Sequence, residues 1–361
     1  MQMKPFNRYR LFFAAGIALL ASSFLTCVDS IDFKPKSDVI SSLTVNGKLV
    51  YSNPSFVTVT AGRIIDYTPT PTEGLDLKDV LLYDEAGHEV SIPAVGIGKY
   101  ALTIPQNFPG IQIERGKSYG IRLETKGGKQ YESTLEPLLP VPEPISLTYE
   151  SMIKHVIDPS GSEYDVPYLN FYLKTNILEP SSSRPSILHL AMEQTTEFQD
   201  TAHHTCYRTQ PINDNNIRLI NGYEFTTDQV EIFVYETPPH SGFSGDSYIH
   251  VIQESLPENA YSFYQSIQKV IARNGNMFED PVGKVRSNIS NVDDPEEDIF
   301  GFFYATEADT IRVFVDPMDL PPGITPYCIG SGQNGDSYIY YCQDCRIDPA
   351  STTVKPYYWH P

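Results

Sequence analysis

His203, His204 and Cys206 are the first residues whose types could do chemistry. Imidazole nitrogen and thiolate sulfur are ligands that zinc prefers, so one interpretation is a metal site. Adjacent side chains on a strand point to opposite faces, however, and no H-E-x-x-H pattern accompanies them. We therefore interpret these residues as part of a solvated loop.

Cys342 and Cys345 form a C-x-x-C motif near the C-terminal end of the sequence. A redox motif of this kind needs a helix N-terminus to lower the pKa of its thiol. The preceding residues, SYIYYC, are instead typical of a strand, and the motif encloses an acidic residue. The pattern favours a structural pair of cysteines over a redox site.

A dense acidic segment offers oxygen ligands of the kind that Ca²⁺ binds. Its members are Asp293, Asp294, Glu296, Glu297 and Asp298. The spacing is not that of an EF-hand loop, and a strand-like segment, IFGFFYAT, follows directly. We therefore favour a solvated acidic turn and predict no metal site, with these five residues as the weak candidates.

The tripeptide Gly-Asp-Ser occurs twice, at 245–247 and 335–337, and resembles the start of one hydrolase family. That family needs its serine at a strand-to-helix turn and an Asp-x-x-His further along, and this sequence places strand-like residues after both motifs. No G-x-S-x-G elbow, phosphate-binding loop or dinucleotide fingerprint is present. We predict no catalytic residue, no cofactor and no enzymatic activity.

The elements that must position these residues are mostly strands. The chain has 361 residues with 12% aromatic residues and 29 prolines, a composition that favours strands and turns. Short runs of alternating polarity recur between turn signals, which is typical of β-sandwiches. The formal net charge of −19 argues against nucleic acid as a partner.

The N-terminal segment, 1–26, is typical of a lipoprotein signal peptide. Basic residues precede an apolar run from Leu11 to Leu25, which is shorter than the ~20 residues of a membrane span. Cys27 follows at the position where a bacterial lipoprotein carries its diacylglycerol and acyl lipid, and an ordinary signal peptide with an incidental cysteine is the alternative. We expect a lipid anchor that attaches the protein to a membrane.

Five segments are expected along the chain: the signal peptide, a tether at 27–38, an N-terminal β-sandwich at 39–136, a proline-rich linker at 137–144 and a C-terminal β-rich domain at 145–361. The N-terminal sandwich has turn and strand patterns similar to immunoglobulin-like and transthyretin-like modules. One amphipathic helix is expected in the second domain, beginning at a capping box from Ser255 to Glu258. The fold class is therefore mainly β, with two tandem sandwich-like domains.

Four cysteines remain if Cys27 carries lipid, and export to an oxidising compartment favours their pairing. The candidates are Cys206, Cys328, Cys342 and Cys345. Four cysteines allow three connectivities, which sequence alone does not distinguish. We predict one bond within the tail, from Cys328 to Cys342 or Cys345, and one long-range bond from Cys206 to the remaining cysteine.

Several stretches together resemble a Bacteroidota outer-membrane lipoprotein family catalogued as a domain of unknown function. They are the cysteine after the signal, LTVNGKL, PLLPVPEP, AYSFYQSI, NMFEDPVGKVRSNISNVDDPEEDIFGFFYAT and CQDCR with KPYYW. The resemblance implies an outer-membrane location, with the protein facing the cell surface or the periplasm. Members are often encoded near TonB-dependent receptors, and no catalytic residues are established for the family, so none is carried over. Where members favour Gly-Asn-Ile, this chain has Ser287-Asn288-Ile289.

The first functional hypothesis is a non-enzymatic binding or accessory module that assists TonB-dependent uptake across the outer membrane. Its expected partners are the membrane, through the lipid anchor, and a TonB-dependent transporter; its ligand is unknown. The alternatives are a structural or adhesive surface module and a hydrolase whose site is assembled from dispersed residues. A pocket with convergent polar groups would favour binding or catalysis over the adhesive role.

Overall fold

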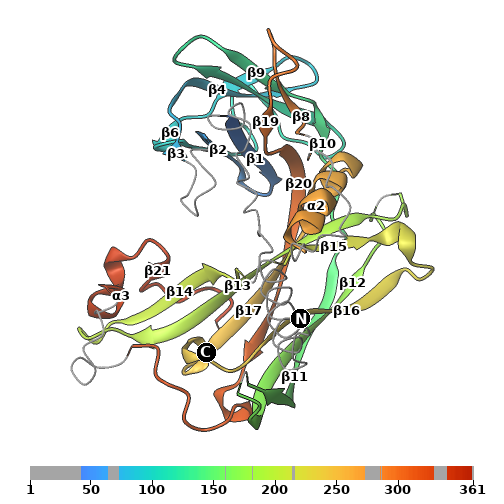
Figure 1. Cartoon of the computed structure of the whole chain (residues 1–361). Helices are drawn as coiled ribbons and strands as arrows, with labels where there is room; N and C mark the ends of the chain where they lie inside the picture. The colour runs from blue at the N-terminus through green and yellow to red at the C-terminus, as the bar shows by residue number, and fades with distance from the viewer. Residues whose placement is uncertain are drawn as a thin grey trace, which may run out of the picture. The chain divides into compact units, whose positions relative to one another are not determined.

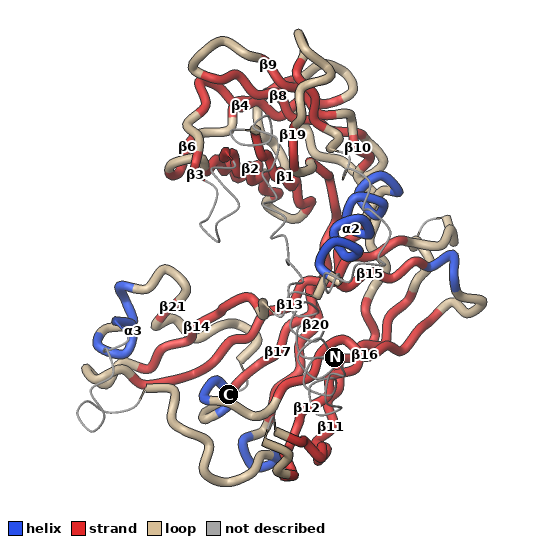
Figure 2. The backbone as a smooth tube through the Cα atoms, in the orientation of Figure 1, coloured by secondary structure: helices blue, strands red, loops and turns tan. Residues whose placement is uncertain are grey.

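The computed structural model describes residues 42–63, 73–158, 160–180, 182–213, 216–272, 285, 287–328 and 340–359 (Figure 1). The predicted signal peptide, the tether and Cys27 lie outside these residues. The predicted mainly β fold is confirmed, since strands dominate the described chain (Figure 2).

The largest sheet has 12 strands. In spatial order its main path is β21 (Ser351–Thr352), β14 (Thr205–Pro211), β13 (Ile187–Gln199), β17 (Ser247–Ser255), β20 (Phe303–Val315), β1 (Leu43–Tyr51), β2 (Ser55–Arg63), β7 (Lys99–Ile104) and β6 (Ala94–Gly96). Three short strands pair beside this path: β15 (Arg218–Asn221), β19 (Ile299–Phe300) and β3 (Glu73–Gly74).

Two smaller sheets cover parts of this large sheet. The first has six strands, β18 (Ile289–Asn291), β9 (Gln130–Ser133), β8 (Ser118–Thr125), β4 (Leu77–Asp84), β5 (Glu89–Ser91) and β10 (Glu136–Pro137). The second has three strands, β11 (Pro144–Ile157), β12 (Glu163–Asn176) and β16 (Gln229–Thr237). Each smaller sheet shares a hydrophobic core with one part of the large sheet.

Strand β20 belongs to both parts of the large sheet. Its first half, Phe303 to Glu307, pairs in parallel with β1, and its second half, Ala308 to Val315, pairs antiparallel with β17. The core that encloses β1, β2 and β8 therefore includes Ile289 and Phe303, which are far along the sequence. Residues from both sides of the predicted division at 137–144 therefore build this core, which argues against independent folding of the segment 39–136.

The proline-rich segment 137–144 is held along its length by hydrogen bonds. Leu138 exchanges backbone hydrogen bonds with Gly116 and Lys117 at 2.9 and 2.8 Å. The buried Ser255 hydroxyl donates to the Leu139 carbonyl at 2.6 Å, and the Gln253 amide donates to the Pro142 carbonyl at 2.6 Å. These contacts fix the segment against the turn that precedes β8 and against β17.

Helix α2 (Glu258–Ile271) is the amphipathic helix that the sequence predicts, and its Phe263 ring stacks on Phe302 with centroids 4.9 Å apart. The predicted capping box is wrong. Ser255 ends β17 and its hydroxyl bonds Leu139, so Pro257 takes the N-cap position without a side-chain cap.

The expected strand at SYIYYC is also wrong at its described end. Residues Tyr340–Gln343 form the short helix α3, and Cys345–Ile347 form the 3₁₀ helix η4. Three other 3₁₀ helices are described, η1 (Gly222–Glu224), η2 (Ser241–Phe243) and η3 (Pro317–Asp319). Within the described ranges, no helix combines the length and apolarity that crossing a bilayer requires.

Candidate functional site

The four candidate cysteines form two disulfides. Cys206 bonds Cys345 with Cα atoms 6.4 Å apart, and Cys328 bonds Cys342 with Cα atoms 5.5 Å apart. One bond is therefore long-range and one lies within the tail, as predicted. The structure also shows which cysteines pair, a choice that the sequence left open. The long-range bond holds η4 against β14.

The C-terminal aromatic residues pack near this bond on the same strands. Trp359 is buried, and its ring lies 4.9 Å from the rings of both Tyr207 and Tyr248. The Cys206–Cys345 disulfide and these ring contacts together hold the tail against β14 and β17.

The acidic segment is a turn built around Asn291. The Asn291 side chain accepts hydrogen bonds from the backbone of Asp293 at 2.9 Å and of Asp294 at 3.3 Å. Burial opposes ionisation of Glu297, but hydrogen bonds from Asn291 and Lys129 lower the pKa of its carboxyl group. These internal contacts account for the segment as a turn.

The histidine loop gathers a group that the sequence did not bring together. Asp200, which is buried, accepts a hydrogen bond from the His204 backbone at 2.9 Å and lies 2.9 Å from Nδ1 of its ring. Asp344, far along the chain, has a carboxylate oxygen within 4.8 Å of both groups. Arg346 bonds both oxygens of Asp344 at 2.8 Å and lowers its pKa to about 2. His203 and His204 lie in a loop, as predicted, but the prediction is wrong for Cys206, which is fully buried on β14 and bonded to Cys345.

The first Gly-Asp-Ser motif leads directly into a strand. Ser247 is the first residue of β17 and is fully buried. The second motif lies outside the described residues. The serine of the described motif therefore stands on a strand, away from any strand-to-helix turn.

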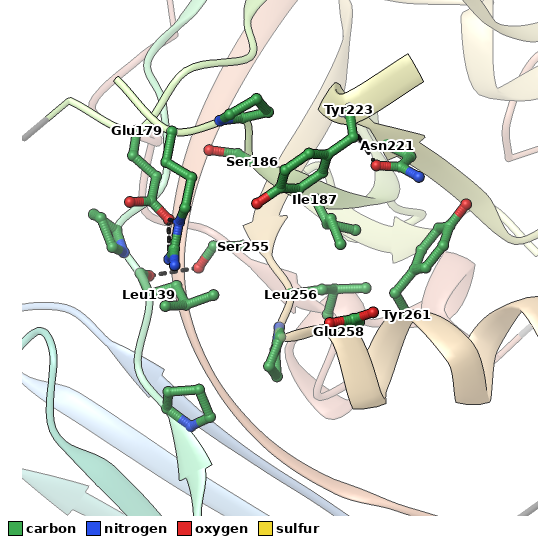
Figure 3. Close-up of a pocket in the computed structure, with 15 residues that line it drawn as sticks. Leu139, Glu179, Ser186, Ile187, Asn221, Tyr223, Ser255, Leu256, Glu258 and Tyr261 are labelled. Atoms are coloured by element: carbon green, nitrogen blue, oxygen red, sulfur yellow. Dashed lines mark hydrogen bonds and ion pairs between the residues drawn. The ribbon is translucent and has the colours of Figure 1, made fainter. Parts of the chain in front are cut away.

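A cleft of about 580 Å³ lies where α2 begins, and we call it the α2 cleft (Figure 3). Four segments that are distant in sequence line it. Its lining residues are Pro137, Leu139, Pro140, Glu179, Arg184, Pro185, Ser186, Ile187, Asn221, Tyr223, Ser255, Leu256, Pro257, Glu258 and Tyr261. The fixed proline-rich segment is one wall of this cleft.

The base of the α2 cleft is apolar, and the register of two strands sets its position. Leu188 pairs with Ser255 between β13 and β17, and Leu256 donates a backbone hydrogen bond to Ile187 at 2.8 Å. Ile187 and Leu256 thus lie side by side where the two strands meet α2 (Figure 3).

An ion pair and a serine provide polar groups at one end of the cleft. Arg184 donates to the Glu179 carboxylate at 2.6 and 3.0 Å, and this hydrogen bond raises the pKa of the guanidinium. Ser186 is 5% exposed, and its hydroxyl oxygen has no hydrogen-bond partner among the described residues. A buried hydroxyl without a partner costs free energy that a ligand can recover.

Two tyrosines, an amide and a carboxylate surround the other end. Tyr223 is 59% exposed, and Asn221 accepts a hydrogen bond from its backbone at 3.2 Å. Figure 3 shows the rings of Tyr223 and Tyr261 on either side of Ile187, with the Glu258 carboxylate next to Leu256. Glu258 lies in the first turn of α2, where the helix dipole favours a negative charge.

A buried charge network lies between α2 and the paired strands β13 and β17. Glu254 is 1% exposed and contacts Lys48 at 2.5 Å, His189 at 3.0 Å and the Tyr304 hydroxyl at 3.1 Å. Burial opposes its ionisation, but the hydrogen bond from His189 and the charge of Lys48 lower its pKa to about 2. The His189 ring also stacks on Tyr264 of α2 at 4.8 Å.

This network ties β1, β13, β17, β20 and α2 together at one point. Burial raises the pKa of Tyr264 to about 12 and that of Tyr304 well above its usual value, so both phenols stay protonated and can donate. Because Glu254 is enclosed, we assign the network a structural role.

Sequence reasoning did not find the cleft. Ser186 and Tyr223 belong to no motif, and Glu258 was predicted only as the end of a capping box. Strand pairing between distant segments brings the three residues to one cleft. The sequence indicated the proline-rich segment and the predicted helix AYSFYQSI, which both line the cleft. It gave no information on which strands would lie next to these two segments.

The sheets, the helix and the cleft define a mainly β protein with a surface cleft of mixed apolar and polar lining, the kind of concavity in which small ligands bind. The chain belongs to the family described as domain of unknown function DUF4249, whose model matches residues 28–312. That range contains every residue of the α2 cleft and ends before Cys328. No curated protein matches the sequence.

Proposed function

We propose that this protein is a non-enzymatic ligand-binding module of the cell envelope, and that the α2 cleft is its binding site. The observation that carries the proposal is the buried Ser186 hydroxyl, which lines the cleft and has no partner among the described residues. An apolar base with a few polar groups at its edge is the usual composition of a small-molecule site.

Attachment to a membrane through a lipid is part of this proposal. We propose that Cys27 carries the diacylglycerol, since it follows the basic and apolar parts of a signal peptide. The outer membrane of a Bacteroidota cell, with the protein facing its surface or the periplasm, is the proposed location. Supply of ligand to a TonB-dependent transporter is the proposed role, supported by the resemblance of the sequence blocks.

An adhesive role is the second candidate, and one surface favours it. Strand β11 carries two exposed apolar side chains on one face, Ile153 at 66% and Ile157 at 65% exposure. Large exposed apolar patches commonly mark contacts with other proteins.

A ligand screen tests the binding proposal. The mature chain with Cys27→Ser is screened against a library of cationic, neutral and anionic fragments by saturation-transfer NMR. Tyr223→Ala and its control Tyr357→Ala both remove exposed tyrosines, but only Tyr223 lines the cleft. We expect bound fragments whose signal weakens in Tyr223→Ala and persists in Tyr357→Ala. Fragments that respond equally to both variants would contradict the proposed site.

A further inference from the structure

The charges around the α2 cleft do not cancel. Arg184 is engaged by Glu179, whose side chain is 7% exposed, so this pair contributes little net charge. Glu258 is the other carboxylate of the lining, and it forms no ion pair within the described chain. The cleft therefore keeps an exposed negative charge that no basic residue of its lining neutralises.

Two aromatic rings flank the apolar part of the cleft. In Figure 3 the Tyr261 ring lies on the α2 side with Glu258, and the Tyr223 ring lies across Ile187 from it with its hydroxyl directed toward Ser186. The face of an aromatic ring attracts a cation, and a carboxylate nearby adds to the attraction. Leu139, Ile187 and Leu256 offer an apolar surface beside them.

From these groups we infer that the α2 cleft binds an organic cation, a primary ammonium or guanidinium group attached to an apolar body. This inference rests on the proposed function and names its ligand class. The cation lies against Glu258 and the Tyr261 ring, the apolar body covers Ile187 and Leu256, and a polar atom of the ligand bonds the Ser186 hydroxyl.

The charge of the whole chain acts in the same direction. With 45 acidic and 26 basic residues, the protein attracts cations at long range and repels anions. A carboxylate ligand would meet Glu258 at short range without a free cation of the lining to compensate. A neutral ligand would gain no electrostatic attraction from the Glu258 carboxylate.

Three probes of equal shape and different charge separate these cases. They are 4-phenylbutylamine, 4-phenylbutanol and 4-phenylbutyrate, measured by isothermal titration calorimetry against the mature chain with Cys27→Ser. We expect the amine to bind at least tenfold more tightly than the alcohol, and the carboxylate to bind most weakly. Added salt should weaken the amine and leave the alcohol nearly unchanged.

Glu258→Gln tests the assigned carboxylate, with Glu231→Gln on the exposed edge of β16 as the control. We expect Glu258→Gln to weaken the amine about tenfold, to leave the alcohol unchanged, and to unfold at the wild-type temperature within a few degrees. Glu231→Gln should leave all three affinities unchanged.

The capped tripeptide Ac-Leu-Lys-Leu-NH₂ separates the two sources of such a cation. Binding tighter than that of the free amine identifies a basic side chain of a partner protein, and weaker binding identifies a small molecule.

Three results would overturn the inference. Equal binding of alcohol and amine, or an amine affinity that Glu258→Gln does not change, would refute the ligand class and leave the cleft a binding site. Binding of none of the three probes would overturn both the ligand class and the proposed function.

Discussion

Lys48→Met should destabilise the fold because it removes one cation from the buried carboxylate of Glu254. A pKa lowered from 4.5 to about 2 corresponds to about 3 kcal/mol of stabilisation of the ionised carboxylate in the folded state. His189 and the Tyr304 hydroxyl remain as partners of Glu254 after the substitution. We therefore expect the free energy of unfolding at pH 7 to fall by about 2 kcal/mol. This is less than the ~3–5 kcal/mol lost when a buried charge is left without any partner.

The pH dependence provides the sharper test. The folded-state pKa of Glu254 lies below its unfolded value, so its stabilisation is present above about pH 4.5 and is lost as the pH falls towards 2. Without Lys48 that pKa rises, and less stability is lost on acidification. The difference between wild type and Lys48→Met in urea denaturation should therefore be largest at pH 7 and should shrink between pH 4.5 and pH 2.

Lys78→Met is the matched control, since Lys78 contacts Glu124 across two strands at 2.8 Å on the surface. It should leave the free energy of unfolding nearly unchanged, because exposed ion pairs contribute little. A loss below about 0.5 kcal/mol in Lys48→Met, the size expected of an exposed pair, or a loss that is the same at pH 7 and pH 2, would refute the reasoning.

Three further predictions concern the anchor, the tail and the N-terminal sandwich. Cys27→Ser should move the protein from the membrane fraction to the soluble fraction; sedimentation with membranes like wild type would place the anchor elsewhere. Replacing Cys206 and Cys345 by alanine should lower stability by up to about 5 kcal/mol, because their bond closes a loop with a sequence separation of 139; peptide mapping without reduction should recover this pair, and free thiols would contradict it. The fragment 38–140 should be largely unfolded by circular dichroism, since the segment 289–307 completes its core, and a cooperatively folded fragment would contradict the shared core.

Local patterns predicted the strands well because apolar and polar residues alternate in the sequence just as buried and exposed side chains alternate on a half-buried strand. In β2 the buried side chains of Val57, Val59 and Ala61 alternate with exposed ones, and this period is visible in the sequence. The amphipathic face of α2 was predicted for the same reason. Its first turn was not, because Ser255 bonds the distant Leu139 carbonyl, and no local pattern reports such a competitor.

The sequence did not predict which distant residues and strands pair with one another. Cysteine counting limited the disulfides to a few pairings but could not choose Cys345 over Cys342 as the partner of Cys206. The pairing of β1 with β20 joins segments more than 250 residues apart, and it decides where the first core is completed. The α2 cleft depends on several such pairings at once, so its residues could not be grouped in advance.

The central claim is that the α2 cleft binds a ligand, and backbone chemical-shift mapping tests it most directly. The mature chain with Cys27→Ser is titrated with 4-phenylbutylamine, and amide shifts are followed to saturation. The account predicts that the largest shifts fall on Ser186, Ile187, Tyr223 and Glu258, while amides near Trp359 do not move. Saturable shifts confined to another surface, or the absence of shifts at millimolar probe, would contradict it.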